Sequence, residues 1–358
     1  MRFLGVAAVV AGALALPAAA GADAPHDLRT DIATVKGSVT HRYNLHDDQG
    51  GRMDALDIVQ TGRGQYAGVY HTNSGLRFAL QVATSTNLVT WTRRATLDTD
   101  ASQGAISVLP GGGFVVAYEK SFFPVAPRPQ LFHKPLPLPN AGRPLSQIRF
   151  RAYPGLDALL TGRQSAEYTA PRTLGLTAEG TPNIQRVSGG PGIDQTVIDV
   201  GFHYYTDING DGTPDVDRQA TGVLTNFGKW TTADSPLINA EFLHPLVLHP
   251  GFTLPPAGNL GDRDDFVFEH RELAIDEVQY VEDDFGSWRL FLRDPGSGQV
   301  LPFSPVTRGH SRSFANPSIT PVRTPAGNRA LFVSLFVFAE GSAPGESGPL
   351  VYVVKVPR

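Results

Sequence analysis

The chain has 358 residues, a net charge of −4, no cysteine, 38 glycines and 29 prolines. The mild charge, without a basic stripe, excludes a typical nucleic-acid-binding protein, and the lack of cysteine excludes a disulfide scaffold. Turn residues are frequent and no long segment keeps a 3.6-residue apolar period, so we expect an all-β domain with a large core.

The first 22 residues read as a signal peptide. Arg2 gives a positive start, residues 3–16 are apolar but too short to span a bilayer, and small residues at 18–20 and 20–22 offer cleavage sites. No later stretch is long enough for a membrane helix. We therefore expect a secreted protein that needs no membrane partner, with residues 23–358 forming a single domain.

Five segments repeat one plan, in which a polar or small cluster leads into an apolar strand. These segments are 53–59, 102–108, 178–184, 261–267 and 313–319. Partner strands are expected at 65–70, 114–118 and 331–337. A repeat of about fifty to eighty residues predicts a five-bladed β-propeller with these first strands innermost. The last strand, 350–356, is expected to close the ring by pairing with N-terminal strands. A double-sheet sandwich is the alternative.

The three tryptophans share one frame, in which Asn or Asp precedes a large apolar residue and Trp comes fifth. The frames are Asn87 to Trp91, Asn226 to Trp230 and Asp284 to Trp288. The third should lie in a different register, because Trp288 continues into an apolar stretch. Long connections are expected at 121–144 and 236–258, and residues 153–162 could form one helical turn.

One of these frames resembles a known motif. The run Ser85-Thr86-Asn87-Leu88-Val89-Thr90-Trp91 resembles the blade motif of five-bladed glycoside hydrolases, the arabinanases, arabinofuranosidases and β-xylosidases. Glu179-Gly180-Thr181-Pro182 resembles their acid motif with one residue inserted, and Asp54 lies where such enzymes place an Asp on the first inner strand. The resemblance implies hydrolysis of a polysaccharide or oligosaccharide, such as an arabinose- or xylose-containing one. We expect a monomer.

The resemblance also assigns catalytic roles. An inverting enzyme needs two carboxyl groups about 6.5–9.5 Å apart, one of them kept protonated. By resemblance Asp54 is the general base and Glu179 the general acid. Asp57 competes with Asp54 for the role of base. Alternatively, Asp54 is an ordinary turn residue and Glu179 a solvated loop carboxylate. The family places an Asp on blade two that tunes the acid. Here that position reads Gln103, so Asp264 or Asp262 is the expected replacement.

Four residues are candidates for substrate binding: Gln103, His203, Arg263 and Asn316. Arg263 could bind a hydroxyl or carboxylate of the substrate. His203 lies in an aromatic strand, where a packed, hydrogen-bonded histidine is the alternative. Asn316 could instead cap the turn before Pro317.

Residues 207–215 form an acidic, glycine-containing loop. Asp207, Asn209, Asp211 and Asp215 occupy positions one, three, five and nine, with Gly212 sixth, and oxygen ligands in this pattern suit Ca²⁺. Arg218 stands where an EF-hand would have Glu, so we expect a structural Ca²⁺ loop of another type. A metal-free turn is the alternative.

Two rival functions stay open. Gln103 in place of a carboxylate favours a non-catalytic propeller that binds glycans or cell-wall material. A sialidase-like hydrolase or polysaccharide lyase is a third possibility, but a sialidase would need an arginine cluster and only Arg263 is well placed.

Overall fold

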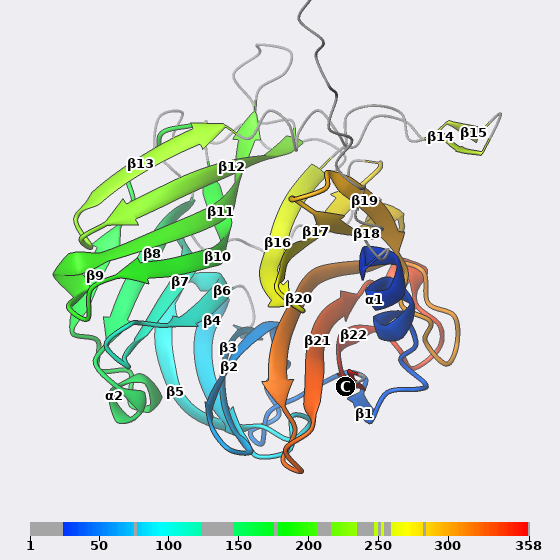
Figure 1. Ribbon diagram of the computed structural model, residues 1–358, viewed down its shortest axis with the longest axis horizontal. Helices are drawn as coiled ribbons and strands as arrows, with labels where there is room; N and C mark the ends of the chain where they lie inside the picture. Colours follow the sequence, from blue (N-terminus) through cyan, green and yellow to red (C-terminus); the bar gives the residue numbers. More distant parts are fainter. Residues whose placement is uncertain are drawn as a thin grey trace, which may run out of the picture.

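The computed structural model describes residues 24–74, 77–122, 146–174, 178–206, 216–234, 247–249, 252–253, 259–281 and 284–356. Within them, five four-stranded antiparallel sheets stand around a common axis as the blades of a β-propeller (Figure 1). The fold predicted from the sequence is confirmed, and the sandwich is wrong.

The strands follow one another blade by blade. Blade 1 contains β2 (Asp54–Gly62), β3 (Gln65–Ser74), β4 (Arg77–Ser85) and β5 (Thr92–Thr99). Blade 2 contains β6 (Ala101–Val108), β7 (Phe114–Ser121), β8 (Ser146–Tyr153) and β9 (Ala166–Thr169). Blade 3 contains β10 (Glu179–Gly189), β11 (Thr196–Thr206), β12 (Val216–Thr225) and β13 (Lys229–Asp234). Blade 4 contains β16 (Asn259–Phe268), β17 (Arg271–Gln279), β18 (Trp288–Asp294) and β19 (Gln299–Phe303). Blade 5 contains β20 (Phe314–Arg323), β21 (Arg329–Val337), β22 (Gly348–Lys355) and β1 (Thr40–Arg42).

The remaining elements are short. They are the helices α1 (Ala24–Ala33) and α2 (Leu156–Leu160), the 3₁₀ turns η1 (Ile193–Gln195), η2 (Phe285–Ser287) and η3 (Ala339–Gly341), and the hairpin of β14 (Val247–His249) with β15 (Phe252–Thr253). The helical turn expected within 153–162 is therefore confirmed as α2. The expected connection at 121–144 lies outside the described residues apart from its first two positions, and most of 236–258 lies outside them as well. Among the described helices, none is long and apolar enough to cross a membrane.

All five predicted first strands are innermost. β2, β6, β10, β16 and β20 face the middle of the ring, and each contacts the inner strands of the blades on either side (Figure 1). Because every inner strand begins at the same end of the axis, the five strand openings gather around one mouth of the central channel.

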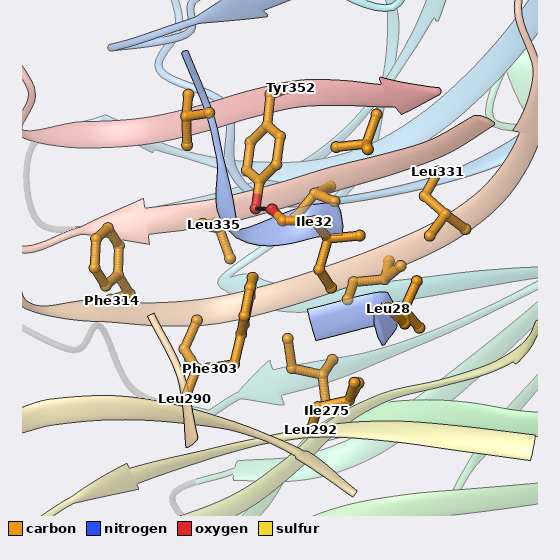
Figure 2. Close-up of a cluster of buried hydrophobic side chains, with 14 of the residues drawn as sticks. Leu28, Ile32, Ile275, Leu290, Leu292, Phe303, Phe314, Leu331, Leu335 and Tyr352 are labelled. Atoms are coloured by element: carbon orange, nitrogen blue, oxygen red, sulfur yellow. Dashed lines mark hydrogen bonds between the residues drawn. The ribbon is translucent and has the colours of Figure 1, made fainter. Parts of the chain in front are cut away.

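The two chain ends close the ring in blade 5. β22 pairs with β1, with Thr40 opposite Val353, so the expected pairing of the last strand with an N-terminal strand is confirmed. Helix α1 packs its Leu28 and Ile32 into a buried cluster formed by blades 4 and 5 (Figure 2). The hydroxyl of Tyr352 donates to the carbonyl of Ile32 at 2.9 Å, which fixes the end of the helix on the sheet.

The tryptophan frames mark blade edges in two registers. Trp91 directly precedes β5, the outer strand of blade 1, and Trp230 lies in β13, the outer strand of blade 3. Both side chains are buried. Trp288 opens β18, which is the third strand of blade 4. The predicted difference in register is confirmed.

Candidate functional site at one mouth of the channel

Each inner strand carries a β-bulge close to its opening. Register shifts fall between Asp54 and Asp57, Ser102 and Ala105, Gly180 and Asn183, Asp262 and Asp264, and Ala315 and Ser318. In four of the five strands the bulge holds a non-glycine residue at positive φ, namely Ala55 (50°), Gln103 (52°), Thr181 (49°) and Asn316 (48°). Bulges re-aim side chains, and strained backbone of this kind clusters at functional sites. The repeated distortion makes this mouth the candidate site.

Side chains from the second strands hold the bulges in place. The N–H of Gln103 donates to Nδ1 of His71 at 3.3 Å, the N–H of Thr181 to Glu119 at 3.3 Å, and the N–H of Asn316 to Glu277 at 2.5 Å. In each case the acceptor belongs to the blade before. His71, Glu119 and Glu277 therefore surround the mouth and join neighbouring blades.

Asp54 is the buried carboxylate of blade 1 at this level. It is 4% exposed and pairs with His71 across β2 and β3. Its Oδ2 accepts from Nε and Nη2 of Arg52 at 3.1 and 2.8 Å. Its Oδ1 is enclosed and has no hydrogen-bond partner among the residues described. A buried carboxylate oxygen without a hydrogen-bond partner can accept a hydrogen bond from a water or a substrate hydroxyl.

His71 is a neutral hydrogen-bonding group beside Asp54. Burial lowers the pKa of His71 to about 4, although the charge of Asp54 acts in the opposite direction. Because its Nδ1 accepts from Gln103, the proton of the neutral ring lies on Nε2.

Glu119 is a partly accessible acid at the boundary between blades 2 and 3. A Cβ placed on Gly180 would lie 2.3 Å from Oε2 of Glu119, so this carboxyl takes the space that a side chain at position 180 would fill. Burial raises the pKa of Glu119, and the negative charge of Asp217 raises it further. A carboxyl that favours its protonated form has the property required of a general acid.

Glu179 has a different environment from its neighbour Gly180. It is 2% exposed, and its Oε1 accepts from the N–H groups of Thr173, at 2.6 Å, and Leu174. The corresponding positions of other inner strands are Met53, Ala101 and Phe314, all fully buried. Glu179 therefore anchors the segment before β10 from a position that is apolar in those other blades.

Arg263 reaches across the channel from blade 4. Its Nη2 donates to Oε1 of Gln103 in blade 2 at 2.9 Å, and its Nε lies 3.4 Å from a carboxylate oxygen of Glu277. Arg263, Gln103 and Asn316 line a narrow cavity of about 20 Å³ on the axis. That volume suits about one water molecule, so a sugar ring has to bind above the cavity, at the mouth.

Two further carboxyls lie deeper in the same cavity. The hydroxyl of Ser318 is 3.2 Å from Asp57 and 3.0 Å from Asp264, and these two also accept the N–H groups of Ile106 and Ile319 in neighbouring blades. Burial raises the pKa of Asp57 to about 6, and burial together with the charge of Asp57 raises that of Asp264 well above its ordinary value. A single hydroxyl proton cannot bond to both carboxylates at once, which favours protonation of one carboxyl, which then donates to the Ser318 oxygen.

The structure brings Asp54, Gln103, Arg263, Asp264 and Asn316 to this mouth and its channel. His203 is 6% exposed and packed between blades 3 and 4, with Nδ1 3.6 Å from Asp217. Its Nε2 is enclosed without a hydrogen-bond partner among the residues described, and His203 pairs with Gly180 across β10 and β11 as His71 pairs with Asp54, so its role in substrate binding stays a prediction. The proposed calcium ligands Asp207, Asn209, Asp211 and Asp215 lie outside the described residues. Among the described residues, no group of three or more His, Cys, Asp or Glu side chains could hold a metal ion.

Sequence reasoning missed His71, Glu119 and Glu277. The second strands were expected to end at Tyr70 and Tyr118, one residue before the first two of them, whereas β3 and β7 continue to Ser74 and Ser121. A charged or imidazole side chain directly after an apolar strand is the signal that could have identified them.

A larger cavity of about 820 Å³ lies where the inner strands end, at the opposite side of the ring. Gln60, Arg63, Phe268, Arg323 and Arg329 are among the residues that line it. None of its lining residues is a carboxylate, so it lacks the groups that two-carboxylate hydrolysis requires.

Comparison with solved structures identifies the fold. A glycoside hydrolase matches with a TM-score of 0.58 and 9% identity, over 93% of this chain and 95% of that one. An α-L-arabinofuranosidase from Lactobacillus brevis matches with a TM-score of 0.52 and 7% identity, over 86% of this chain and 94% of that one. No protein-family model and no curated protein matches the sequence. The chain has the five-bladed propeller fold of glycoside hydrolases.

Proposed function

We propose that the protein is a secreted glycoside hydrolase that cleaves a polysaccharide or oligosaccharide at the mouth formed by the five strand openings. The observation that carries the proposal is the carboxyl set at this mouth. Asp54 is buried with one free oxygen, and Glu119 is a partly accessible carboxyl whose pKa is raised. The fold of the similar structures supports the same conclusion.

The chemistry assigns one role to each carboxyl. Asp54 takes a proton from water as the water oxygen attacks the anomeric carbon, and the bond from that carbon to the leaving oxygen breaks. A protonated carboxyl on the other side gives its proton to the leaving oxygen. Water attacks the face opposite the leaving group, so the configuration inverts.

Glu119 is the acid that we favour over Glu179. Glu119 lies in the space beside Gly180 and favours its protonated form. Glu179 already accepts two backbone N–H bonds from the segment before β10. Glu119 accepts one such bond, from Thr181 at 3.3 Å, and is more exposed than Glu179, so it is the better placed of the two to donate a proton to a substrate.

The substrate class follows from the resemblance and the fold. Arabinose- or xylose-containing glycans are the first candidates, because the blade motif resembles that of arabinanases and xylosidases and one similar structure is an α-L-arabinofuranosidase. His71 would donate from Nε2 to a sugar hydroxyl, and Arg263 would orient the ring next to Asp54. We expect a monomer to suffice, because all of these groups come from one chain.

Reducing-sugar release from a panel of plant and bacterial cell-wall glycans tests the proposal. Asp54→Asn and Glu119→Gln should each lower the rate at least a hundredfold on the substrate that is cleaved, because general acid–base catalysis contributes about 10²–10⁴-fold. Glu179→Gln is the comparison for the acid, and thermal unfolding shows whether each variant is folded. Full activity of Glu119→Gln with loss of activity in a folded Glu179→Gln protein would reverse the assignment.

A folded protein that releases sugar from no glycan would support the rival function, a non-catalytic glycan-binding propeller. That rival is favoured by Gln103, which supplies an amide where the resembling enzymes have a carboxylate. Affinity electrophoresis in gels containing the same glycans distinguishes it from a protein that binds none.

A further inference from the structure

Four aromatic side chains gather beside the mouth, between blades 4 and 5. Phe338 is at the centre, with ring centroids 5.0 Å from Phe285, 5.0 Å from Phe336 and 6.2 Å from Trp288, on which it stacks at 21°. Phe285 lies in η2, Trp288 opens β18, Phe336 lies near the end of β21, and Phe338 follows β21 directly. We call these four residues the aromatic platform.

The platform is not part of the protein core. None of its members belongs to the five buried clusters of the described residues, Phe285 is 40% exposed, and the other three are half-buried. Large aromatic side chains are normally among the most completely buried groups, and exposed apolar patches mark interaction sites. Four rings packed together at the surface therefore indicate a binding function.

The platform is continuous with the candidate site. Phe336 pairs with Ala315 across β20 and β21, at the level of the blade 5 bulge. The guanidinium of Arg52 lies over the Phe336 ring, 5.3 Å from its centroid, and the same guanidinium pairs with Asp54 at 2.8 Å. The side chain of Arg52 therefore contacts both the candidate base, Asp54, and the platform.

Sugar rings fit such a surface. One face of a furanose or pyranose carries mainly C–H bonds, whose weakly positive hydrogens pack against the negative face of an aromatic ring. The hydroxyl groups at the rim of the sugar remain free for Arg52 and for water.

We propose that the aromatic platform binds the sugar units of a glycan chain that extends from the unit held at Asp54 toward blades 4 and 5. The inference rests on the proposed function for the identity of the ligand. It makes the protein an enzyme that recognises a chain of sugars and not a single unit.

Hydrolysis of long and short substrates tests the platform. On a linear polysaccharide that the wild type cleaves, Phe338→Ala and Trp288→Ala should each raise KM about tenfold and leave kcat within twofold. On an aryl glycoside of a single sugar, both variants should match the wild type. Phe268→Ala, an aromatic truncation where β16 ends on the other side of the ring, is the control and should change neither substrate. An unchanged KM on the polysaccharide, or an equal loss on both substrates, overturns the platform while leaving the hydrolase proposal intact.

Binding provides a test that does not depend on turnover. Trp91 and Trp230 are buried in core clusters, so Trp288 is the indole that a surface ligand reaches. Titration with arabinohexaose and xylohexaose should shift the tryptophan emission of the Asp54→Asn protein, and Trp288→Phe in that background should abolish the shift. If neither wild type nor variant hydrolyses any glycan but the shift occurs, the platform stands and the hydrolase proposal fails. If no hexasaccharide shifts the emission, the platform is overturned.

Discussion

Arg263 of blade 4 and Gln103 of blade 2 meet across the channel, with Nη2 and Oε1 2.9 Å apart. The amide orients a guanidinium without neutralising it. Glu277, 3.4 Å from Nε, supplies the balancing charge instead. The charge of Arg263 also acts on Asp57 and His71, whose pKa values it lowers.

Removal of that amide should weaken substrate binding. In Gln103→Ala the guanidinium of Arg263 loses the hydrogen bond at Nη2 and keeps only Glu277, so we expect KM to rise about tenfold, equivalent to about 1.4 kcal/mol, with a smaller change in kcat. Steady-state kinetics on the cleaved glycan measures this. Gln147→Ala, which removes a half-buried amide bonded to the carbonyl of Ala170 in blade 2, should leave KM unchanged. An unchanged KM in Gln103→Ala would mean that Arg263 does not contact substrate.

Asp217 should control the alkaline side of the pH–rate profile. Its charge raises the pKa of Glu119, so Asp217→Asn should lower that pKa. The protonated acid is then lost at a lower pH, and the alkaline limb of kcat/KM should move to lower pH. Asp199→Asn, at a surface carboxylate paired with Arg186, is the matched control and should leave the limb in place. A limb that does not move in Asp217→Asn argues against Glu119 as the acid.

Much of the architecture could be predicted because every blade repeats the same local pattern. Strand openings such as Met53 to Val59 combine polar residues with an apolar run, and their spacing is a property of the sequence alone. The bulges are different. One extra residue changes the face of the sheet to which the following side chains point, so the sequence could not decide which of Glu179 and Gly180 faces the mouth.

The residues that were missed depend on contacts between blades. Glu119 is relevant because Gly180, 61 positions later in the chain, leaves it space, and His71 because the backbone of Gln103 bonds to it. Neither relationship is encoded in a local motif.

Asp57 should make stability fall with rising pH. Burial raises the pKa of Asp57 from 3.8 to about 6, so the folded protein holds this proton more tightly than the unfolded chain. The folded state then loses stability as pH rises from about 4 through about 6. Asp57→Asn keeps one acceptor oxygen for the two N–H groups of Ile58 and Ile106 and cannot ionise, so its thermal midpoint should fall less across this range. Differential scanning calorimetry from pH 4 to pH 8 compares the two proteins. Parallel curves for both proteins would contradict the assignment.

The contact of α1 with blades 4 and 5 should contribute measurably to stability. Ile32→Ala leaves a cavity in the cluster of Figure 2 and should cost about 2–5 kcal/mol of unfolding free energy. Tyr352→Phe removes only the hydrogen bond to the carbonyl of Ile32 and should cost about 1 kcal/mol. Urea unfolding measures both. Asp31→Ala, at an exposed position of the same helix, should change the free energy by less than about 0.5 kcal/mol.

We propose that the segment 207–215 binds a structural Ca²⁺ through Asp207, Asn209, Asp211 and Asp215, and calcium removal tests this. A ligand that binds only the folded state stabilises it by about 2.7 kcal/mol at a hundredfold excess over Kd, so EDTA should lower the thermal midpoint by a few degrees and added Ca²⁺ should restore it. Asp211→Ala should have the lower midpoint in either condition and lose the response. Asp194→Ala, at an exposed carboxylate of η1, should keep the full response. An identical midpoint with EDTA and with Ca²⁺ in the wild type would leave residues 207–215 as a metal-free turn.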